Sequence, residues 1–166
     1  FEYYNNNSPQ SYIVAIPSSY NYRVNYSGKR IYDSSINFNT VYNMVSEMYS
    51  KGATNIFGLG CVQWTSRDRI KPLVDLYKQV NGGRSTITFD EVANAEGVMI
   101  ARELNGSYKY IYTSWKSSNL SNLDSQTAAY NAGYDLCMKY EVPANRYSKA
   151  PARGDLAKAI YIDMVK

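Results

Sequence analysis

The sequence predicts an α+β fold that is mostly α-helical, and three observations carry this prediction. Five segments repeat apolar residues at the 3.6-residue period of a helix. One short glycine-rich segment, residues 53–65, has the composition of a tight strand pair or of a loop packed against the core. Strands and helices do not alternate along the chain, which disfavours a parallel sheet with crossover helices. Residues 1–166 show no internal repeat and are expected to form a single domain.

The first two helices flank the glycine-rich segment. The first is expected at residues 39–51, where apolar side chains share one face and Gly52 follows as a stop. Its apolar face comprises Val41, Met44, Val45, Met48 and Tyr49. The second helix is expected to begin with Asp68 as its cap and to run to Val80.

The third helix begins with a capping box. In Thr88-Phe-Asp-Glu91 the hydroxyl and the carboxylate can each accept a hydrogen bond from the other residue's backbone, and the helix should extend through Leu104. Gly97 inside this helix costs about 1 kcal/mol relative to Ala. Its presence therefore indicates close packing at that position.

Two more helices are expected near the C-terminus. Asp124 can cap a helix that runs to Tyr140, before Pro143 prevents continuation. Pro151 suits the first turn of the last helix, which should end near Val165. Three of its residues are expected to point inward: Leu156, Ile160 and Met164.

Composition excludes several classes of function. The chain has no histidine, which removes Ser-His and Cys-His nucleophile pairs and histidine metal sites, so we expect no metal or cofactor. A net charge of +4 with scattered Lys and Arg does not predict nucleic-acid binding. No apolar run approaches the roughly 20 residues of a membrane span. Because the chain begins at Phe1 without a signal peptide, we expect it to be excised from a longer chain.

The two cysteines, Cys61 and Cys137, are too few for a zinc site and too far apart for a CxxC redox motif. They are either buried reduced thiols or one disulfide. Both alternatives stay open from the residues alone.

The most specific stretch is Gly-Leu-Gly-Cys-Val-Gln-Trp-Thr at residues 58–65, followed by Arg67 and Arg69. Glycines let a hairpin backbone approach a sugar, and the Gln63 amide can bind an N-acetyl group or a water molecule. The alternative is a structural hairpin in which Gln63 satisfies buried backbone and Trp64 belongs to the core.

This stretch resembles the Gly-aromatic-Gly-x-x-Gln-Trp-Thr signature of the phage tail lysozyme family and, more distantly, the Gly-Leu-Met-Gln motif of lytic transglycosylases. A second segment, residues 136–143, is similar to the family's pattern of Cys, two spacers, aromatic, Glu, x and Pro. Glu103-Leu104 and residues 153–161 extend the resemblance, which covers about residues 57–162. It implies a lysozyme-like fold with a small β-hairpin.

Ala129-Tyr-Asn-Ala-Gly133 has the form of a further lytic transglycosylase motif, whose Tyr helps to orient the catalytic carboxyl group. The resemblance gives this role to Tyr130. The alternative is that these small residues serve helix packing.

The resemblance implies a peptidoglycan glycosidase that cleaves the β-1,4 bond between N-acetylmuramic acid and N-acetylglucosamine during phage entry. Its expected partners are bacterial peptidoglycan and other phage tail proteins, and its expected location is the virion tail, acting on the cell wall. Gln63 and Thr65 would position the N-acetyl group or the water molecule. No cofactor is implied.

The catalytic acid departs from the family pattern. In these families it is a Glu, normally followed by Ser, at the end of an N-terminal helix that this sequence is expected to lack. Glu2 is the only Glu before residue 47, and alignment of Tyr4-Asn-Asn-Asn-Ser-Pro9 with the family motif places Tyr4 at the catalytic position. Either Glu2 is the acid in a shifted register, or another acid serves, or the domain is not catalytic.

A hydrolase generally needs a second carboxylate. Asp33 and Asp68 are the candidates, although Asp68 also suits a helix cap. Without a second carboxylate, attack by the muramyl 6-hydroxyl would make the protein a lytic transglycosylase. The rival from another class is an inactive lysozyme-like structural or cell-wall-binding tail module.

Overall fold

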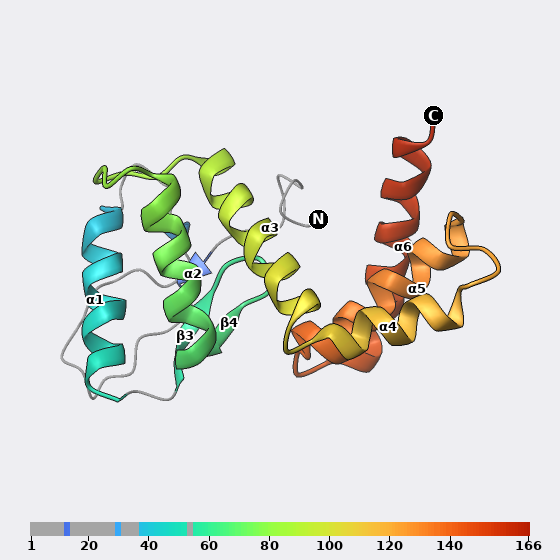
Figure 1. The fold of residues 1–166 in the computed structure, drawn as a ribbon, viewed down its shortest axis with the longest axis horizontal. Coiled ribbons are helices and arrows are strands. Elements are labelled where there is room, and N and C mark those ends of the chain that lie inside the picture. Colours follow the sequence, from blue (N-terminus) through green and yellow to red (C-terminus); the bar gives the residue numbers. More distant parts are fainter. Residues whose placement is uncertain (1–11, 14–28, 31–36, 53–54) are drawn as a thin grey trace. The chain divides into compact units, whose positions relative to one another are not determined.

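The computed structural model describes residues 12–13, 29–30, 37–52 and 55–166. The chain divides into an N-terminal unit that ends at Ile100 and a C-terminal unit, Ala101–Lys166. The described residues form six α-helices, one π-helical segment and two antiparallel strand pairs (Figure 1). The prediction of a mostly α-helical α+β fold is therefore confirmed.

Helices α1 (Phe38–Ser50) and α2 (Arg67–Val80) lie side by side in the N-terminal unit (Figure 1). Both bury one apolar face, as their periodicity predicts. From α1 the buried side chains are Phe38, Val41, Met44, Val45 and Met48, and from α2 they are Ile70, Leu73, Val74, Leu76 and Tyr77. The predicted first helix is confirmed, but Tyr49 is exposed rather than buried.

Two short antiparallel strand pairs belong to the N-terminal unit. Strand β1 (Tyr12–Ile13) pairs with β2 (Lys29–Arg30). Strand β3 (Asn55–Leu59) pairs with β4 (Trp64–Ser66), with an irregular register between its ends. The second pair confirms the predicted glycine-rich hairpin, which packs against α2 (Figure 1).

Helix α2 begins earlier than predicted. Strand β4 runs directly into the helix, so extended Ser66 takes the N-cap position and Asp68 lies inside the first turn. Asp68 is exposed and pairs with Arg67, with 3.4 Å between Oδ1 and Nε. The prediction that Asp68 is the cap is wrong, although a carboxylate in the first turn still interacts favourably with the helix dipole.

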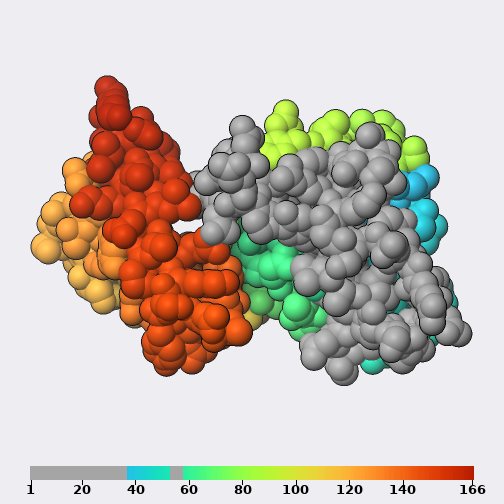
Figure 2. All heavy atoms as spheres, turned by 180° about the vertical axis from the view of Figure 1, so that it is seen from behind, coloured from blue at the N-terminus to red at the C-terminus, as the bar shows by residue number. Residues whose placement is uncertain are grey.

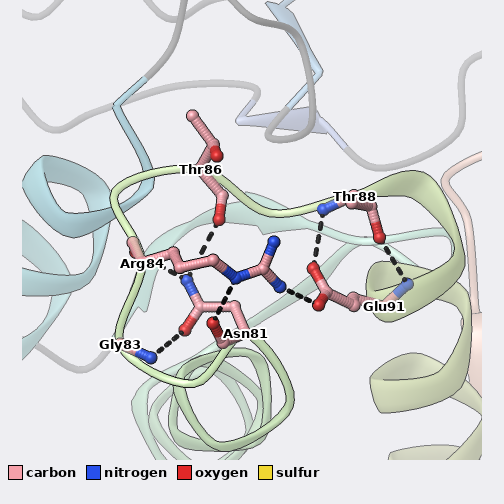
Figure 3. Close-up of polar contacts among 6 residues, drawn as sticks. All are labelled: Asn81, Gly83, Arg84, Thr86, Thr88 and Glu91. Carbon is pink, nitrogen blue, oxygen red and sulfur yellow. Dashed lines mark hydrogen bonds and ion pairs between the residues drawn. The ribbon is translucent and has the colours of Figure 1, made fainter.

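The turn between α2 and α3 (Phe89–Asn105) is organised by one buried amide (Figure 3). Asn81 Nδ2 donates to the carbonyl oxygens of Arg84 at 2.7 Å and Thr86 at 3.3 Å, while its Oδ1 accepts from the Gly83 amide at 2.9 Å. These bonds satisfy backbone groups that a loop would otherwise leave unpaired.

The predicted capping box at the start of α3 is confirmed. Glu91 Oε2 accepts from the Thr88 amide at 2.9 Å, and Thr88 Oγ1 accepts from the Glu91 amide at 3.3 Å. Arg84 forms an ion pair with the same carboxylate (Figure 3).

Further along α3, Gly97 is exposed and a Cβ there would meet no atom within 4 Å. The predicted close packing at Gly97 is therefore wrong.

The C-terminal unit contains α4 (Lys109–Ser118), α5 (Gln126–Leu136), a π-helical segment (Cys137–Glu141) and α6 (Arg146–Met164). Helix α6 forms much of the surface of this unit in the space-filling view (Figure 2). Sequence patterns did not predict α4, because the polar residues around it are typical of loops and Ile111 is its only buried residue.

Helix boundaries in this unit also differ from the predictions. Ser125, not Asp124, caps α5, and its hydroxyl accepts from the Ala128 amide at 3.1 Å. The Asp124 carboxylate instead accepts from the Tyr161 hydroxyl at 2.8 Å. Helix α6 begins at Arg146, so Pro151 lies inside it, where a proline removes one backbone donor. Met164 is exposed rather than inward.

Candidate functional site

The turn between β3 and β4 presents the first two predicted site residues, Gln63 and Thr65. Gly60 has φ +78° and Gln63 has φ +55°, so both lie in the left-handed region. The Gly60 carbonyl accepts from the Gln63 amide at 3.0 Å and from Gln63 Nε2 at 2.8 Å. Both nitrogens of Gln63 are therefore held by the turn itself, while Thr65 is exposed on β4.

Trp64 forms the base of this turn. Its side chain is fully buried, and a Cβ at Gly60 would lie 2.6 Å from its Cζ3 atom. Only glycine accommodates both this approach and the positive φ angle. Within this segment Trp64 therefore belongs to the core and Gln63 bonds to backbone, as the alternative of a structural hairpin expects.

The Glu96 carboxylate supports the β3–β4 turn through a hydrogen bond, and the sequence patterns did not predict this role. Its side chain is 2% exposed; Oε2 accepts from the Cys61 amide at 2.9 Å and Oε1 accepts from the Tyr77 hydroxyl at 2.6 Å. The carboxylate thus joins the hairpin to α2 and α3. One signal could have found it, because Glu96 shares a helical face with buried Val92 and Met99.

Cys61 of the N-terminal unit and Cys137 of the C-terminal unit are both free thiols in this structure. Burial, together with the charge of Glu96 and a hydrogen bond to it, raises the pKa of the Cys61 thiol well above its usual range. Burial also raises the pKa of Cys137. Because the thiolate is the nucleophilic form, neither side chain is suited to nucleophilic catalysis at neutral pH.

Tyr130 lies on α5 in the C-terminal unit, where it packs against α6. A Cβ at Gly154 would lie 2.6 Å from its ring, and the Tyr134 ring stacks on it with 6.2 Å between the centroids. Gly133 of the same motif faces the Arg153 carbonyl just as closely, since a Cβ there would lie 2.4 Å from the oxygen. The small residues of this motif therefore serve helix packing.

A model of the phage tail lysozyme family matches residues 25–164. The chain belongs to the phage tail lysozyme family. The resemblance inferred from the hairpin and the C-terminal segments is confirmed, and with it the lysozyme-like fold class. No curated protein and no solved structure gives a significant match. Membership of the phage tail lysozymes indicates a peptidoglycan-lytic function associated with phage tails.

Two carboxylates in the segments that resemble phage tail lysozymes are held within the C-terminal unit. The Tyr140 hydroxyl donates to Glu103 in a buried hydrogen bond. Glu141, at the end of the π-helical segment, lies 3.3 Å from Arg153 Nη2, and burial raises the pKa of its carboxyl group. Val142 then turns the chain with φ +47° before Pro143.

The catalytic acid expected for a phage tail lysozyme, Glu2, lies outside the described residues, as does Asp33. Gln63 and Thr65 share one hairpin, whereas Tyr130 belongs to the other unit. Within the described part of the chain, no three Cys, Asp or Glu side chains gather as a metal site. No helix among these residues has the length and apolar character of a membrane span.

Proposed function

We propose that this chain is a muramidase that cleaves the β-1,4 bond between N-acetylmuramic acid and N-acetylglucosamine, carried on the virion tail and acting on the cell wall during phage entry. The observation that carries the proposal is the β3–β4 turn of a phage tail lysozyme, in which the Gly60 carbonyl orients the side-chain amide of the partly exposed Gln63. Such a turn suits an N-acetylated sugar, which offers an amide N–H and a carbonyl oxygen for hydrogen bonding.

Gln63 and Thr65 have the proposed role of positioning the N-acetyl group or the attacking water. The Gly60 carbonyl fixes Gln63 Nε2, which also fixes the direction of the amide oxygen. No residue in the described ranges donates a hydrogen bond to that oxygen, so it can accept one from a sugar N–H. The exposed Thr65 hydroxyl can donate or accept at the same edge of the hairpin.

Glu2 is the proposed general acid, which protonates the leaving glycosidic oxygen. This step requires a carboxyl group with a raised pKa, as a partly apolar environment provides. Tyr130 is proposed to orient that carboxyl group. The contact with Gly154 fixes the position of the phenol ring, and a fixed phenol is what this role needs.

The test is the rate at which the protein clears a suspension of purified peptidoglycan. We expect Glu2→Gln to lower the rate by about 10²- to 10⁴-fold, the usual contribution of a general acid. Gln63→Ala should lower it by about tenfold, because one well-placed hydrogen bond contributes roughly 1 to 1.5 kcal/mol. Glu47→Gln is the matched control, since this exposed carboxylate on α1 pairs with Lys51 and has no proposed role.

An unchanged rate in Glu2→Gln would overturn the assignment of the acid. Wild-type protein that binds purified peptidoglycan without releasing muropeptides would overturn the muramidase proposal itself. That second result would favour a wall-binding tail module.

A further inference from the structure

The C-terminal unit contains a surface hollow between α4 and α5 that the proposed cleavage does not use. Its volume is about 150 Å³. Tyr112 and Trp115 of α4 form one side, and Ala132, Asp135 and Leu136 of α5 form the other. An engineered cavity of about this volume in another protein holds a single six-membered ring. The hollow is therefore sized for one ring, not for a helix or an extended peptide.

Two aromatic rings make an open platform at this hollow. The centroids of Tyr112 and Trp115 lie 6.1 Å apart with 30° between their planes, and Tyr112 is 45% exposed. The Trp115 indole N–H donates to the Ala128 carbonyl at 2.8 Å. Because its polar edge is committed to α5, the indole offers its apolar surface to the hollow.

A chain of amide hydrogen bonds holds this platform in place. Asn119, which is 8% exposed, donates through Nδ2 to the Trp115 carbonyl at 2.7 Å. Its Oδ1 accepts from Asn131 Nδ2 of α5 at 2.9 Å. These bonds tie the end of α4 to α5, so the hollow is formed before any ligand arrives and binding need not order it.

One polar pair borders the apolar surface. The Asp135 carboxylate lies 3.0 Å from Lys139 Nζ, and both side chains are partly exposed. Asp135 lines the hollow whereas Lys139 does not, and the lining itself is almost entirely apolar, so this pair places polar atoms at the edge of the hollow. An apolar site with a few placed polar groups is the usual composition of a small-ligand site.

We propose that this hollow binds one sugar ring of a glycan strand, as a second glycan-binding site whose residues differ from those proposed for cleavage. The C–H face of a pyranose suits the Tyr112 and Trp115 rings, and its hydroxyl groups suit the Asp135 and Lys139 pair. The choice of a peptidoglycan-type sugar rests on the proposed function. Such a site would hold the strand near the enzyme between cleavage events.

The probe is chitotriose, a soluble trimer of N-acetylglucosamine, and the reporter is tryptophan fluorescence. The chain has two tryptophans, of which Trp64 is fully buried and Trp115 lines the hollow. We expect chitotriose to shift the Trp115 emission and to protect it from acrylamide quenching. Tyr112→Ala should weaken this binding by about tenfold, as expected for loss of one aromatic anchor.

Tyr110→Ala is the matched control, because Tyr110 is 58% exposed on the same helix but does not line the hollow. A second variant, Ala132→Leu, fills the hollow without removing an aromatic ring and should also weaken binding. The Glu2→Gln variant should bind chitotriose as the wild type does, which separates this proposal from the proposed catalysis.

Wild-type protein without chitotriose-dependent protection, or Tyr112→Ala with unchanged affinity, would overturn the proposal. Protection by a decyl-chain detergent alone would indicate an aliphatic ligand and overturn it as well.

Discussion

Among single residues, Gly60 and Gly97 lie in opposite environments, one crowded and one open. Gly60 has a positive φ angle, and a Cβ there would lie 2.6 Å from the Trp64 ring, so two separate effects exclude a side chain at this position. Gly97 lies on the open surface of α3, where it adds only backbone freedom to the unfolded chain. One glycine is required by the site, and the other weakens a helix.

We therefore predict opposite effects of one substitution at these two positions. Gly97→Ala should raise the free energy of unfolding by up to about 1 kcal/mol. Gly60→Ala should lower it by about 1 to 3 kcal/mol or more, because the strained φ angle and the clash with Trp64 both oppose the side chain. Urea unfolding of both variants measures the two effects, and a Gly60→Ala protein as stable as the wild type would contradict the account of the turn.

Sequence patterns correctly placed Gln63 and Thr65 in one hairpin, because the two strands of that hairpin are close together along the chain. They did not predict Glu96. Its hydrogen-bond partners, Cys61 and Tyr77, are 35 and 19 positions away along the chain. A lone acidic residue on an amphipathic helix is normally solvated, so only the tertiary contacts identify it as the support of the turn.

Among the secondary-structure elements, sequence patterns predicted an element correctly where its backbone caps and its apolar side chains favour the same structure. Helix α1 and the capping box of α3 were predicted because apolar spacing and cap chemistry indicate the same structure. The caps at Asp68 and Asp124 were misplaced, since serines nearby compete for the same role. Helix α4 was missed because its stability comes from contacts with α5 rather than from its own apolar face.

The capping box predicts a pH-dependent contribution to stability. The hydrogen bond from the Thr88 amide, aided by Arg84, lowers the pKa of Glu91. A lowered pKa in the folded state means that the ionised carboxylate stabilises the protein at neutral pH. This stabilisation begins to be lost as the pH falls below about 4.3, the ordinary pKa of a Glu carboxyl group. It disappears as the pH falls further, through the lower pKa of Glu91 in the folded state.

We expect Glu91→Ala to lower the free energy of unfolding by about 1 kcal/mol at pH 7, because it removes the reciprocal cap. Glu91→Gln is the matched control, since it keeps a hydrogen-bonding side chain but no charge. The stability difference between wild type and Glu91→Gln should shrink as the pH is lowered from 6 to 3. Thermal unfolding across this range measures it, and a constant difference would contradict the assigned role of the charge.

At the scale of the whole molecule, the chain combines an N-terminal unit that carries the glycine hairpin with a C-terminal unit that carries Tyr130 and the aromatic hollow. The sequence predicted the fold class and the family, because the motifs of phage tail lysozymes extend over both units. The hollow could not be predicted in the same way. It depends on Tyr112 and Trp115 of α4, a helix that the sequence patterns did not reveal.

We propose that the protein hydrolyses the glycan strands of peptidoglycan. Mass spectrometry of the products released from purified peptidoglycan distinguishes this activity from its alternatives. Hydrolysis predicts fragments that end in reducing N-acetylmuramic acid, and these fragments should be absent with Glu2→Gln. Glycan strands that stay uncut, or fragments that end in anhydro-muramyl groups, would contradict the claim.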